Sequence, residues 1–399
     1  MTDAHTSSRR NLYILAFALA VVTIGFGLVM PIIPFYMENL GAGGTELGLL
    51  VASYAVMRLI FGPICGDLSD RIGRKPVMMI GVFGYGITMI GFGLATKLWM
   101  MFAARMLSGI LSSATSPTTM AYIGDSTTEE NRGGGMGVLG AAGGIGTIFG
   151  PALGGLLADF SLSTPFFVAA GLSLLSVLSI ALFLPESLEK SRRRHGPHGL
   201  SPLDLKAWAG ALQSPIGPLL IQSLIVMAGL TLFFGVFGLY ALQRFSYGTR
   251  EVGVIFTVLG LMMAIGQGLL VGPLTKRFGD LAVMKLGFLL SSLGLLAMMA
   301  ADRFGLLLAA VGFFSLANSL VSPAVSALTS KWTVLDQGIT MGLSNAFGSL
   351  GRIFGPPIGG YVFDLDLRLP FLSSALIMLA GFWVSARWVA APKSAGTNG

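Results

Sequence analysis

Three arginines stand inside long apolar stretches of this chain of 399 residues: Arg58, Arg105 and Arg352. A charge in a hydrocarbon layer costs between about 3 and 17 kcal/mol, so such a side chain normally faces a cavity or a partner. A guanidinium group binds carboxylates and other oxyanions. We therefore predict that Arg105 faces a cavity. Arg58 can instead snorkel to the membrane surface, and Arg352 can pair with backbone carbonyls at a helix break.

A polar stripe continues from Arg105 along one predicted helix. Ser108, Ser112, Thr115 and Thr119 follow at spacings of three or four, which places them on one face. A matching stripe recurs about 206 residues later, with these members: Ser315, Asn318, Ser319, Ser322, Ser326 and Thr329. Two faces related by a repeat are expected to meet across a water-filled cavity. Hydrogen bonding between helices is the alternative for the serines.

Bulky side chains of the predicted spans 11–36 and 216–243 are further candidates for the cavity wall. They are Phe26, Met30, Tyr36, Gln222, Phe233 and Phe237. An apolar wall with few polar anchors suits a large amphipathic ligand, and methionine can repack around varied shapes. Core packing or contact with lipid is the alternative for each aromatic side chain.

The composition requires a lipid solvent, since 54% of the residues are hydrophobic, 11% are charged and the mean hydropathy is +0.79. A bilayer needs roughly 20 apolar residues per helix. Twelve segments qualify: 11–36, 46–66, 77–96, 98–123, 134–158, 164–184, 216–243, 250–274, 282–300, 304–329, 338–362 and 369–391. The sequence predicts an all-α membrane protein with twelve transmembrane helices.

The basic residues indicate the orientation in the membrane. Seventeen of them fall in the termini and in loops on one side, and five fall on the other side. The positive-inside rule then places both termini in the cytoplasm of a cell with this chain in its inner or plasma membrane.

Repeated motifs divide the chain into two halves. Gly146, Gly150, Pro151, Gly154 and Gly155 form a Gly-x-x-x-Gly-Pro-x-x-Gly-Gly element. The same element returns 205 residues later with Gly355 and Pro356, and it includes Arg352. The spacing lets a neighbouring helix approach closely, and the proline permits a bend. Tight packing alone is the alternative to a role in motion.

We predict two pseudo-symmetric six-helix bundles, 1–184 and 215–399, joined by a cytoplasmic linker at 185–214. The basic run of this linker can bind anionic headgroups or simply remain solvated. His195 and His198 lie in it and make a poor metal site, so no metal is predicted.

The loop after the second span has the composition of a conformational latch. Its residues are Gly66, Asp67, Asp70, Arg71, Gly73, Arg74 and Lys75. The basic side chains can pair with Asp125, Glu129 or Glu130 in the next loop on the same side, holding two helix ends together in one conformation. Anchoring of the topology is the alternative, but the two acidic residues contribute nothing to that. Lys276 stands where Asp70 would recur, which predicts a stronger latch in the first half.

Several of these motifs resemble the major facilitator superfamily. The loop Gly66–Pro76 resembles the signature that this superfamily carries between its second and third spans. The Gly-Pro-Gly-Gly element is similar to the fifth-span motif of its 12-span drug exporters, and Leu98–Ala114 with Arg105 is similar to their fourth-span arginine motif. Gly27–Pro31 resembles tetracycline and multidrug exporters.

This resemblance implies two six-helix bundles, a central cavity open to one side at a time and, often, efflux coupled to protons. The chain departs from the pattern because all 18 Asp and Glu residues lie in loops or at span ends. The candidates for proton coupling are therefore Glu38, Asp67, Asp70 and Asp125. Segments 77–96 and 282–300 lack acidic residues, which argues against a tetracycline–metal chelate as substrate.

The favoured hypothesis is a proton-coupled antiporter that exports amphipathic small molecules by alternating access. The alternatives are an exporter or facilitator of one anionic metabolite, siderophore or lipid, with Arg105 as counter-ion, and a membrane receptor that does not transport. No catalytic constellation lies at usable depth, so we predict no enzyme activity and no cofactor. Scattered basic residues argue against nucleic acid as a partner, and one chain suffices for the fold, which favours a monomer.

Overall fold

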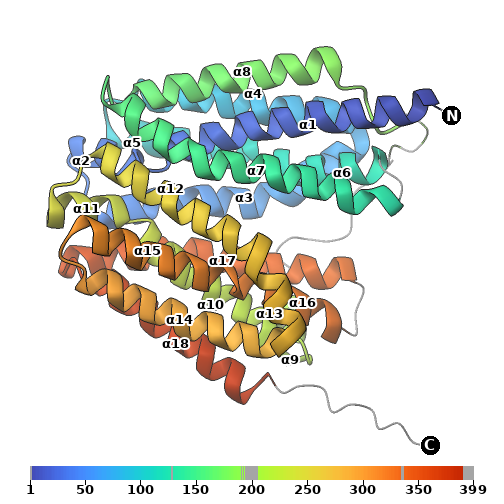
Figure 1. The fold of residues 1–399 in the computed structure, drawn as a ribbon. Helices are drawn as coiled ribbons and strands as arrows, with labels where there is room; N and C mark the ends of the chain where they lie inside the picture. Colours follow the sequence, from blue (N-terminus) through green and yellow to red (C-terminus); the bar gives the residue numbers. More distant parts are fainter. Residues whose placement is uncertain are drawn as a thin grey trace, which may run out of the picture. The chain divides into compact units, whose positions relative to one another are not determined.

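A computed structural model describes residues 2–126, 129–189, 191, 193, 205–333 and 337–389, with a few side chains within these ranges left undescribed. His195, His198 and most of the predicted linker lie outside the described residues. Within them no strand occurs, and the protein is all-helical as predicted (Figure 1).

Ten of the described helices or helix pairs are long and apolar enough to cross a membrane. They match ten of the twelve segments expected from the sequence. The other two segments are helical as well: Leu98–Ser112 and Thr115–Ser126 cover the first of them, and Gln337–Leu365 covers the second, which contains two adjacent prolines and several glycines. The structure is therefore consistent with twelve spans, and ten of them also meet the criteria of length and hydropathy among the described residues.

Contacts between residues divide the chain into two compact units. The first comprises Met1–Leu203 and Gly235–Gly260, and the second comprises Asp204–Phe234 and Leu261–Gly399. The first unit contains α1 (Thr2–Val29), α2 (Ile33–Asn39), α3 (Gly44–Ile72), α4 (Arg74–Gly93), α5 (Leu98–Ser112), α6 (Thr115–Ser126), α7 (Glu129–Ala158), α8 (Thr164–Phe183), α11 (Phe237–Phe245) and most of α12 (Thr249–Ile265).

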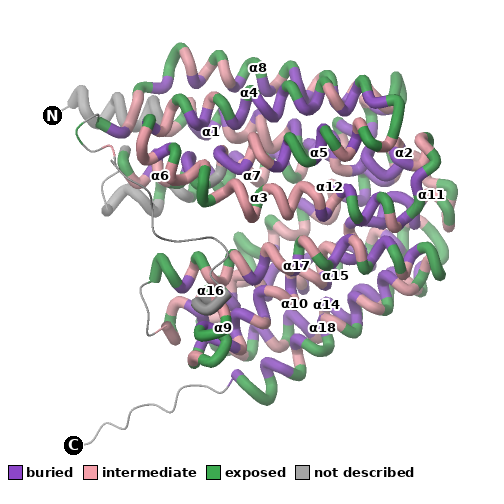
Figure 2. The backbone as a smooth tube through the Cα atoms, turned by 180° about the vertical axis from the view of Figure 1, so that it is seen from behind, coloured by how far each residue is buried: buried purple, intermediate pink, exposed green. Residues whose placement is uncertain are grey.

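Helix α1 packs along α7 and α8 in the first unit, while α4 packs on both α5 and α8 (Figure 1). Small residues and serines mediate these contacts. Ser173 on α8 donates a hydrogen bond to the carbonyl of Val82 (2.6 Å), and Ser176 donates one to the carbonyl of Ala18 (3.1 Å). Figure 2 shows α8 with a buried side and an exposed side along its length, as expected for a helix that faces lipid.

The second unit contains α9 (Leu205–Gln213), α10 (Gly217–Phe234), a π-helical turn (Gly266–Leu270), α13 (Val271–Phe278), α14 (Asp280–Ala300), α15 (Phe304–Ser319), α16 (Val321–Trp332), α17 (Gln337–Leu365) and α18 (Leu369–Arg387). Helix α10 packs on α17 and α18, and α14 packs on α15 and α18. The π-helical turn lies where Ser319 of α15 approaches, so closely that a Cβ on Gly266 would overlap the Ser319 Oγ atom. A π-helical turn inside a helix often marks a functional position.

The glycines of the first repeated element let α7 lie directly on its neighbours. A Cβ on Gly150 would stand 2.7 Å from the Cα of Gly27 on α1, and one on Gly154 would overlap the carbonyl oxygen of Leu28. Gly155 faces α12 instead, and a Cβ on it would stand 2.6 Å from the carbonyl oxygen of Thr249.

The second element packs in the same way on α10. A Cβ on Gly355 would stand 2.8 Å from the carbonyl oxygen of Ala228, while Arg352 of the same element is exposed. Both helices continue through their prolines, Pro151 in α7 and Pro356 in α17. The geometry shows close packing, and a role of these elements in motion stays a prediction.

The two contact units differ from the two halves of the repeat. Residues 235–260 belong to the first unit because α11 packs on α2 and the first part of α12 packs on α7. The division of the chain into 1–184, 185–214 and 215–399 therefore stays a prediction from the repeat.

Candidate functional site

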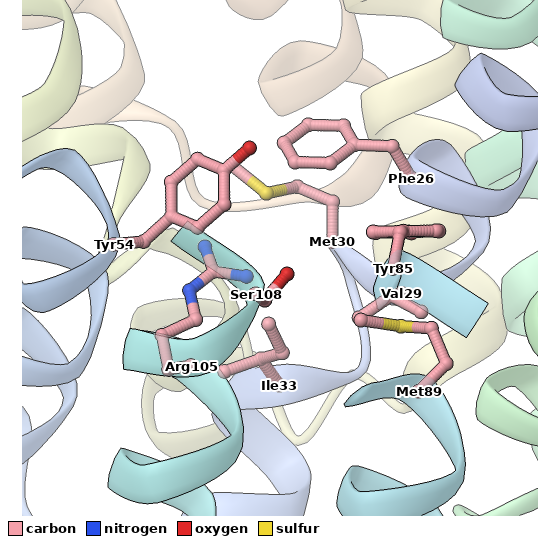
Figure 3. A pocket seen from close by; sticks show the side chains of 9 residues that line it. All are labelled: Phe26, Val29, Met30, Ile33, Tyr54, Tyr85, Met89, Arg105 and Ser108. Carbon is pink, nitrogen blue, oxygen red and sulfur yellow. The ribbon is translucent and has the colours of Figure 1, made fainter. Parts of the chain in front are cut away.

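A narrow pocket in the first unit combines apolar walls with a buried arginine. Its lining consists of Phe26, Val29, Met30, Ile33, Tyr54, Tyr85, Met89, Arg105 and Ser108 (Figure 3). In this conformation the side chains close around the pocket and leave no space for a water molecule. Four of the residues predicted to line a cavity meet here, namely Phe26, Met30, Arg105 and Ser108.

Helical periodicity explains how the helices supply the lining. Phe26 lies in the last turn of α1 and Met30 directly follows that helix, while Tyr85 and Met89 lie on α4; the members of each pair are four residues apart. Arg105 and Ser108 are three apart on α5. Side chains at these spacings project from the same side of a helix, so each of these helices contributes two neighbouring groups.

Gly109 allows α5 to approach α3 at the level of the pocket. A Cβ at this position would stand 2.8 Å from both the Cβ of Met57 and the carbonyl oxygen of Tyr54. Any larger residue would push the two helices apart. The close approach brings the ring of Tyr54 next to Arg105.

The guanidinium group of Arg105 lies over the Tyr54 ring, 4.7 Å from its centroid (Figure 3). The Tyr54 hydroxyl shares a hydrogen bond of 3.0 Å with the Ser112 Oγ atom. Arg105 is only 4% exposed, and it takes part in no ion pair within the described part of the chain. Ser112 thus contacts the hydroxyl of the aromatic ring against which the arginine rests.

Two predicted lining residues of the first unit lie elsewhere. Tyr36 donates a hydrogen bond to the carbonyl of Ala95 (2.9 Å) and packs its ring edge to face with Phe166. Phe237 is buried against Phe256, with ring centroids 5.7 Å apart. In this conformation both residues join helices together and do not line the pocket.

The predicted lining residues of the second unit have different surroundings. Gln222 is fully buried and donates a hydrogen bond to the carbonyl of Gly381 (2.8 Å). Phe233 packs on Phe314 with ring centroids 5.0 Å apart. Asn318 and Ser322 are half-buried, and the buried Nδ2 atom of Asn318 has no hydrogen-bond partner.

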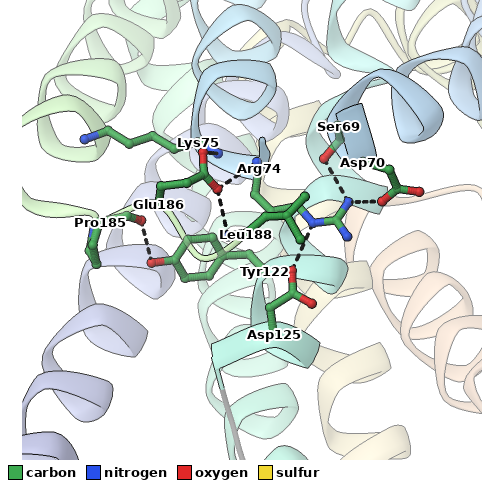
Figure 4. A network of polar contacts seen from close by, with 9 residues as sticks. All are labelled: Ser69, Asp70, Arg74, Lys75, Tyr122, Asp125, Pro185, Glu186 and Leu188. Atoms are coloured by element: carbon green, nitrogen blue, oxygen red, sulfur yellow. Dashed lines mark hydrogen bonds and ion pairs between the residues drawn. The ribbon is translucent and has the colours of Figure 1, made fainter. Parts of the chain in front are cut away.

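The predicted latch forms a polar network at one end of the first unit (Figure 4). Arg74 pairs with Asp70 and, at 3.0 Å from its Nε atom to Oδ2, with Asp125. It also donates a hydrogen bond to the Ser69 hydroxyl (3.1 Å). Arg74 thus joins the end of α3, the start of α4 and the end of α6.

Glu186 is a member of this network that the sequence analysis missed. Its carboxylate accepts hydrogen bonds from the backbone N–H groups of Arg74 (2.9 Å) and Lys75 (3.2 Å), and so caps α4 (Figure 4). Helix α4 begins with two cations, which its dipole disfavours, and the carboxylate compensates for them. The signal was an acidic residue directly after the sixth predicted span, on the side of the latch loop.

Gly73 makes this cap possible. Its φ is +114°, and a Cβ would overlap the Glu186 Oε2 atom. Lys75 donates a hydrogen bond from Nζ to the carbonyl of Ala181 (2.8 Å), and Arg71 pairs with Asp67 at 2.6 Å. Gly66 has open space on the side of its missing Cβ, so no contact explains the glycine there.

The second unit has an ion pair at the positions that repeat Arg74 and Asp125. Asp280 at the start of α14 pairs with Lys331 near the end of α16. Each lies 206 residues after its counterpart, and the two charges are exchanged. Gly279 precedes the pair with φ +80°, as Gly73 precedes Arg74.

Comparisons with known proteins agree with this geometry. The family model of the Major Facilitator Superfamily matches residues 15–270 and 219–399. The chain belongs to this superfamily. It is 31% identical over 373 residues to Multidrug resistance protein 2 of Bacillus subtilis (strain 168), covering 92% of each chain.

A second relative is Multidrug resistance protein 1 of the same organism, which is 32% identical over 385 residues and matches 95% of this chain and 96% of its own length. Among solved structures, the nucleoside transporter NupG superimposes with a TM-score of 0.79 at 16% identity, over 95% of this chain and 99% of its own. At that identity the match concerns the fold alone.

Proposed function

We propose that the protein is a secondary transporter that exports amphipathic small molecules by alternating access. The observation that supports this most is the similarity along more than nine-tenths of the chain to two proteins named for multidrug resistance. The pocket around Arg105 supports it as well. Its walls are aromatic, aliphatic and methionine side chains with few polar groups, a composition that suits ligands of varied shape.

We also propose that export is driven by protons and that the chain works as a monomer in the inner or plasma membrane, with both termini in the cytoplasm. Proton coupling is typical of exporters in this superfamily. Three of the four predicted coupling residues, Asp67, Asp70 and Asp125, are in ion pairs with arginines. A change of conformation that opens these pairs would release the carboxylates from the arginines.

Transport by the purified protein tests the proposal. Proteoliposomes are given an inward or outward pH gradient, and the flux of fluorescent amphipaths of either charge is compared with that in liposomes without protein. We expect flux of at least one amphipath to follow the direction of the gradient. If no probe moves faster than in empty liposomes, with or without a gradient, the protein does not transport this class and the receptor alternative gains.

A further inference from the structure

Three buried polar groups without hydrogen-bond partners converge on the Arg105 pocket. They are the Nε atom of Arg105, the hydroxyl of Tyr85 and the hydroxyl of Ser108. Their residues are 4%, 5% and 1% exposed. A buried polar group without a partner typically costs about 1 to 3 kcal/mol, so few occur in folded proteins. Three around one pocket indicate a ligand that supplies the missing partners.

The chemistry of the three groups indicates what that ligand carries. The guanidinium group can only donate hydrogen bonds, and both hydroxyls can donate as well. The positive charge has no carboxylate paired with it in the described residues. A cationic group would be repelled here, whereas the oxygens of a carboxylate or sulfonate would accept from all three donors and neutralise the charge.

The remaining lining limits the rest of the ligand. Phe26, Met30 and Met89 surround the polar groups with apolar surface (Figure 3). Met30 and Met89 are unbranched and can change rotamer to make room. A ligand with an anionic group and an apolar body would satisfy both parts of the site.

We infer that the pocket is a subsite for the anionic group of an amphipathic ligand. Arg105 is its counter-ion, while Tyr85 and Ser108 donate hydrogen bonds to the same group. The inference deepens the proposed function and rests on it for the fate of the ligand, because binding alone does not export. All residues that line the pocket belong to the first unit.

Two dyes with the same ring body test the subsite. The anionic dye is 1-anilinonaphthalene-8-sulfonate, and N-phenyl-1-naphthylamine lacks only the sulfonate. Each is titrated against the detergent-purified protein while the apparent melting temperature is followed by loss of the gel-filtration peak. A ligand that binds the folded state raises this temperature. We expect the sulfonate to bind the wild-type protein more tightly than the neutral dye.

Substitutions at Arg105 identify the source of the preference. Removal of a charged hydrogen-bond partner weakens binding by about 10- to 100-fold, so Arg105→Gln should bind the sulfonate that much more weakly. Its affinity for the neutral dye should remain unchanged. Arg105→Lys should keep part of the preference because it keeps the charge. Arg58→Gln is the control, since Arg58 is exposed on α3 and its loss should change neither affinity.

The outcomes separate this inference from the proposed function. Equal binding of both dyes, or a sulfonate preference that survives in Arg105→Gln, would overturn the subsite. If Arg105→Gln fails to fold, Ser108→Ala and Arg105→Lys give the same comparison with smaller losses. A charge preference in a protein that moves no amphipath in proteoliposomes would overturn the exporter and leave the subsite standing.

Discussion

The three arginines of the predicted spans have the same side chain and different surroundings. Arg58 and Arg352 are exposed, on α3 and α17. Arg105 is buried, rests on an aromatic ring and has no ion-pair partner in the described part of the chain. Of the three arginines, only Arg105 is withdrawn from the protein surface. A protein keeps such a group where its charge is used.

Tyr54 is expected to hold Arg105 in place through the face of its ring. Tyr54→Phe keeps the ring and loses the hydrogen bond to Ser112, so sulfonate binding should stay close to that of the wild type. Tyr54→Leu removes a cation–π contact of roughly 0.5 to 2 kcal/mol, which corresponds to about 2- to 30-fold weaker binding. Dye titrations of both variants measure this. Equal affinities of the Phe and Leu variants would show that the ring has no such role.

The pocket could be predicted only in part from the sequence. Arg105 and Ser108 stood out because a charge and a polar stripe are rare in an apolar span. Tyr54 and Tyr85 did not, because a tyrosine in a span lies as often at the membrane surface or in the core as at a site. Their position depends on how α3, α4 and α5 pack. Spacing along one helix does not contain that information.

The sequence also does not predict which backbone group a polar side chain will bond to. Gln222 is polar and lies within a span, as a ligand-binding residue would, but its amide reaches the carbonyl of Gly381 on another helix. Glu186 caps α4 from more than 110 residues away in sequence. Neither partner is a side chain, so no pattern of residue types identifies the pair.

At the scale of helices, the two Gly-x-x-x-Gly-Pro-x-x-Gly-Gly elements pack against their neighbouring helices in the same way. Gly150 and Gly154 let α7 lie on α1, and Gly351 and Gly355 let α17 lie on α10. The spacing of four residues places each pair on one face of its helix. The duplication seen in the sequence is thus repeated in the geometry of each unit.

Substitutions on α7 should separate the packed face from the open one. In Gly150→Ala the new Cβ would overlap the backbone of Gly27, and overpacking typically costs about 1 to 3 kcal/mol. Gly144 on the same helix has nothing within 4 Å of its missing Cβ, and alanine is the better helix former. The apparent melting temperature should therefore fall in Gly150→Ala and hold or rise in Gly144→Ala. A similar change of melting temperature in both variants would mean that helix propensity, and not contact with α1, determines the stability at these positions.

The exchanged ion pair at the start of α14 gives a second prediction for the helices. Asp280→Arg or Lys331→Asp alone brings like charges together and should lower the melting temperature. The double variant restores the pair with the polarity of Arg74 and Asp125. It should recover the attraction, which for a partly exposed pair is about 0.2 to 1 kcal/mol.

The double variant should recover only part of the lost stability, for a reason visible in the first unit. A cation at the start of a helix is disfavoured by about 0.3 to 1 kcal/mol relative to an anion, and Glu186 compensates for this at α4. The residue 206 positions after Glu186 is Pro392, which has no carboxylate. Thermal unfolding of the wild type, both single variants and the double variant measures the coupling. If the stability changes of the two single variants add up to the change in the double variant, the ion pair contributes nothing.

At the scale of the whole molecule, hydropathy and the repeat were sufficient to predict an all-helical membrane protein. Hydropathy was less decisive where glycines and prolines dilute a span, as in α17. The contact units could not be predicted, because residues 235–260 pack with the first unit through interactions between helices and not through any change of composition.

The proposed coupling to protons belongs to the scale of the whole molecule, and we predict that the four candidate carboxylates contribute to it unequally. Asp67, Asp70 and Asp125 are in ion pairs, while Glu38 on α2 has none among the described residues. Substitution of Glu38 therefore breaks no ion pair among the described residues, whereas substitution of any of the other three does. We expect Glu38→Gln to lose amphipath accumulation driven by a pH gradient and to keep exchange of the same amphipath in the absence of a gradient.

Asp70→Asn should weaken both the accumulation and the exchange, because it loosens the network that joins α3, α4 and α6. Both fluxes are measured in proteoliposomes, with substitution of Glu46, an acidic residue in the first turn of α3, to Gln as the control. Accumulation that persists in Glu38→Gln would assign proton coupling to the paired carboxylates, so that opening of the latch and uptake of the proton would be one event.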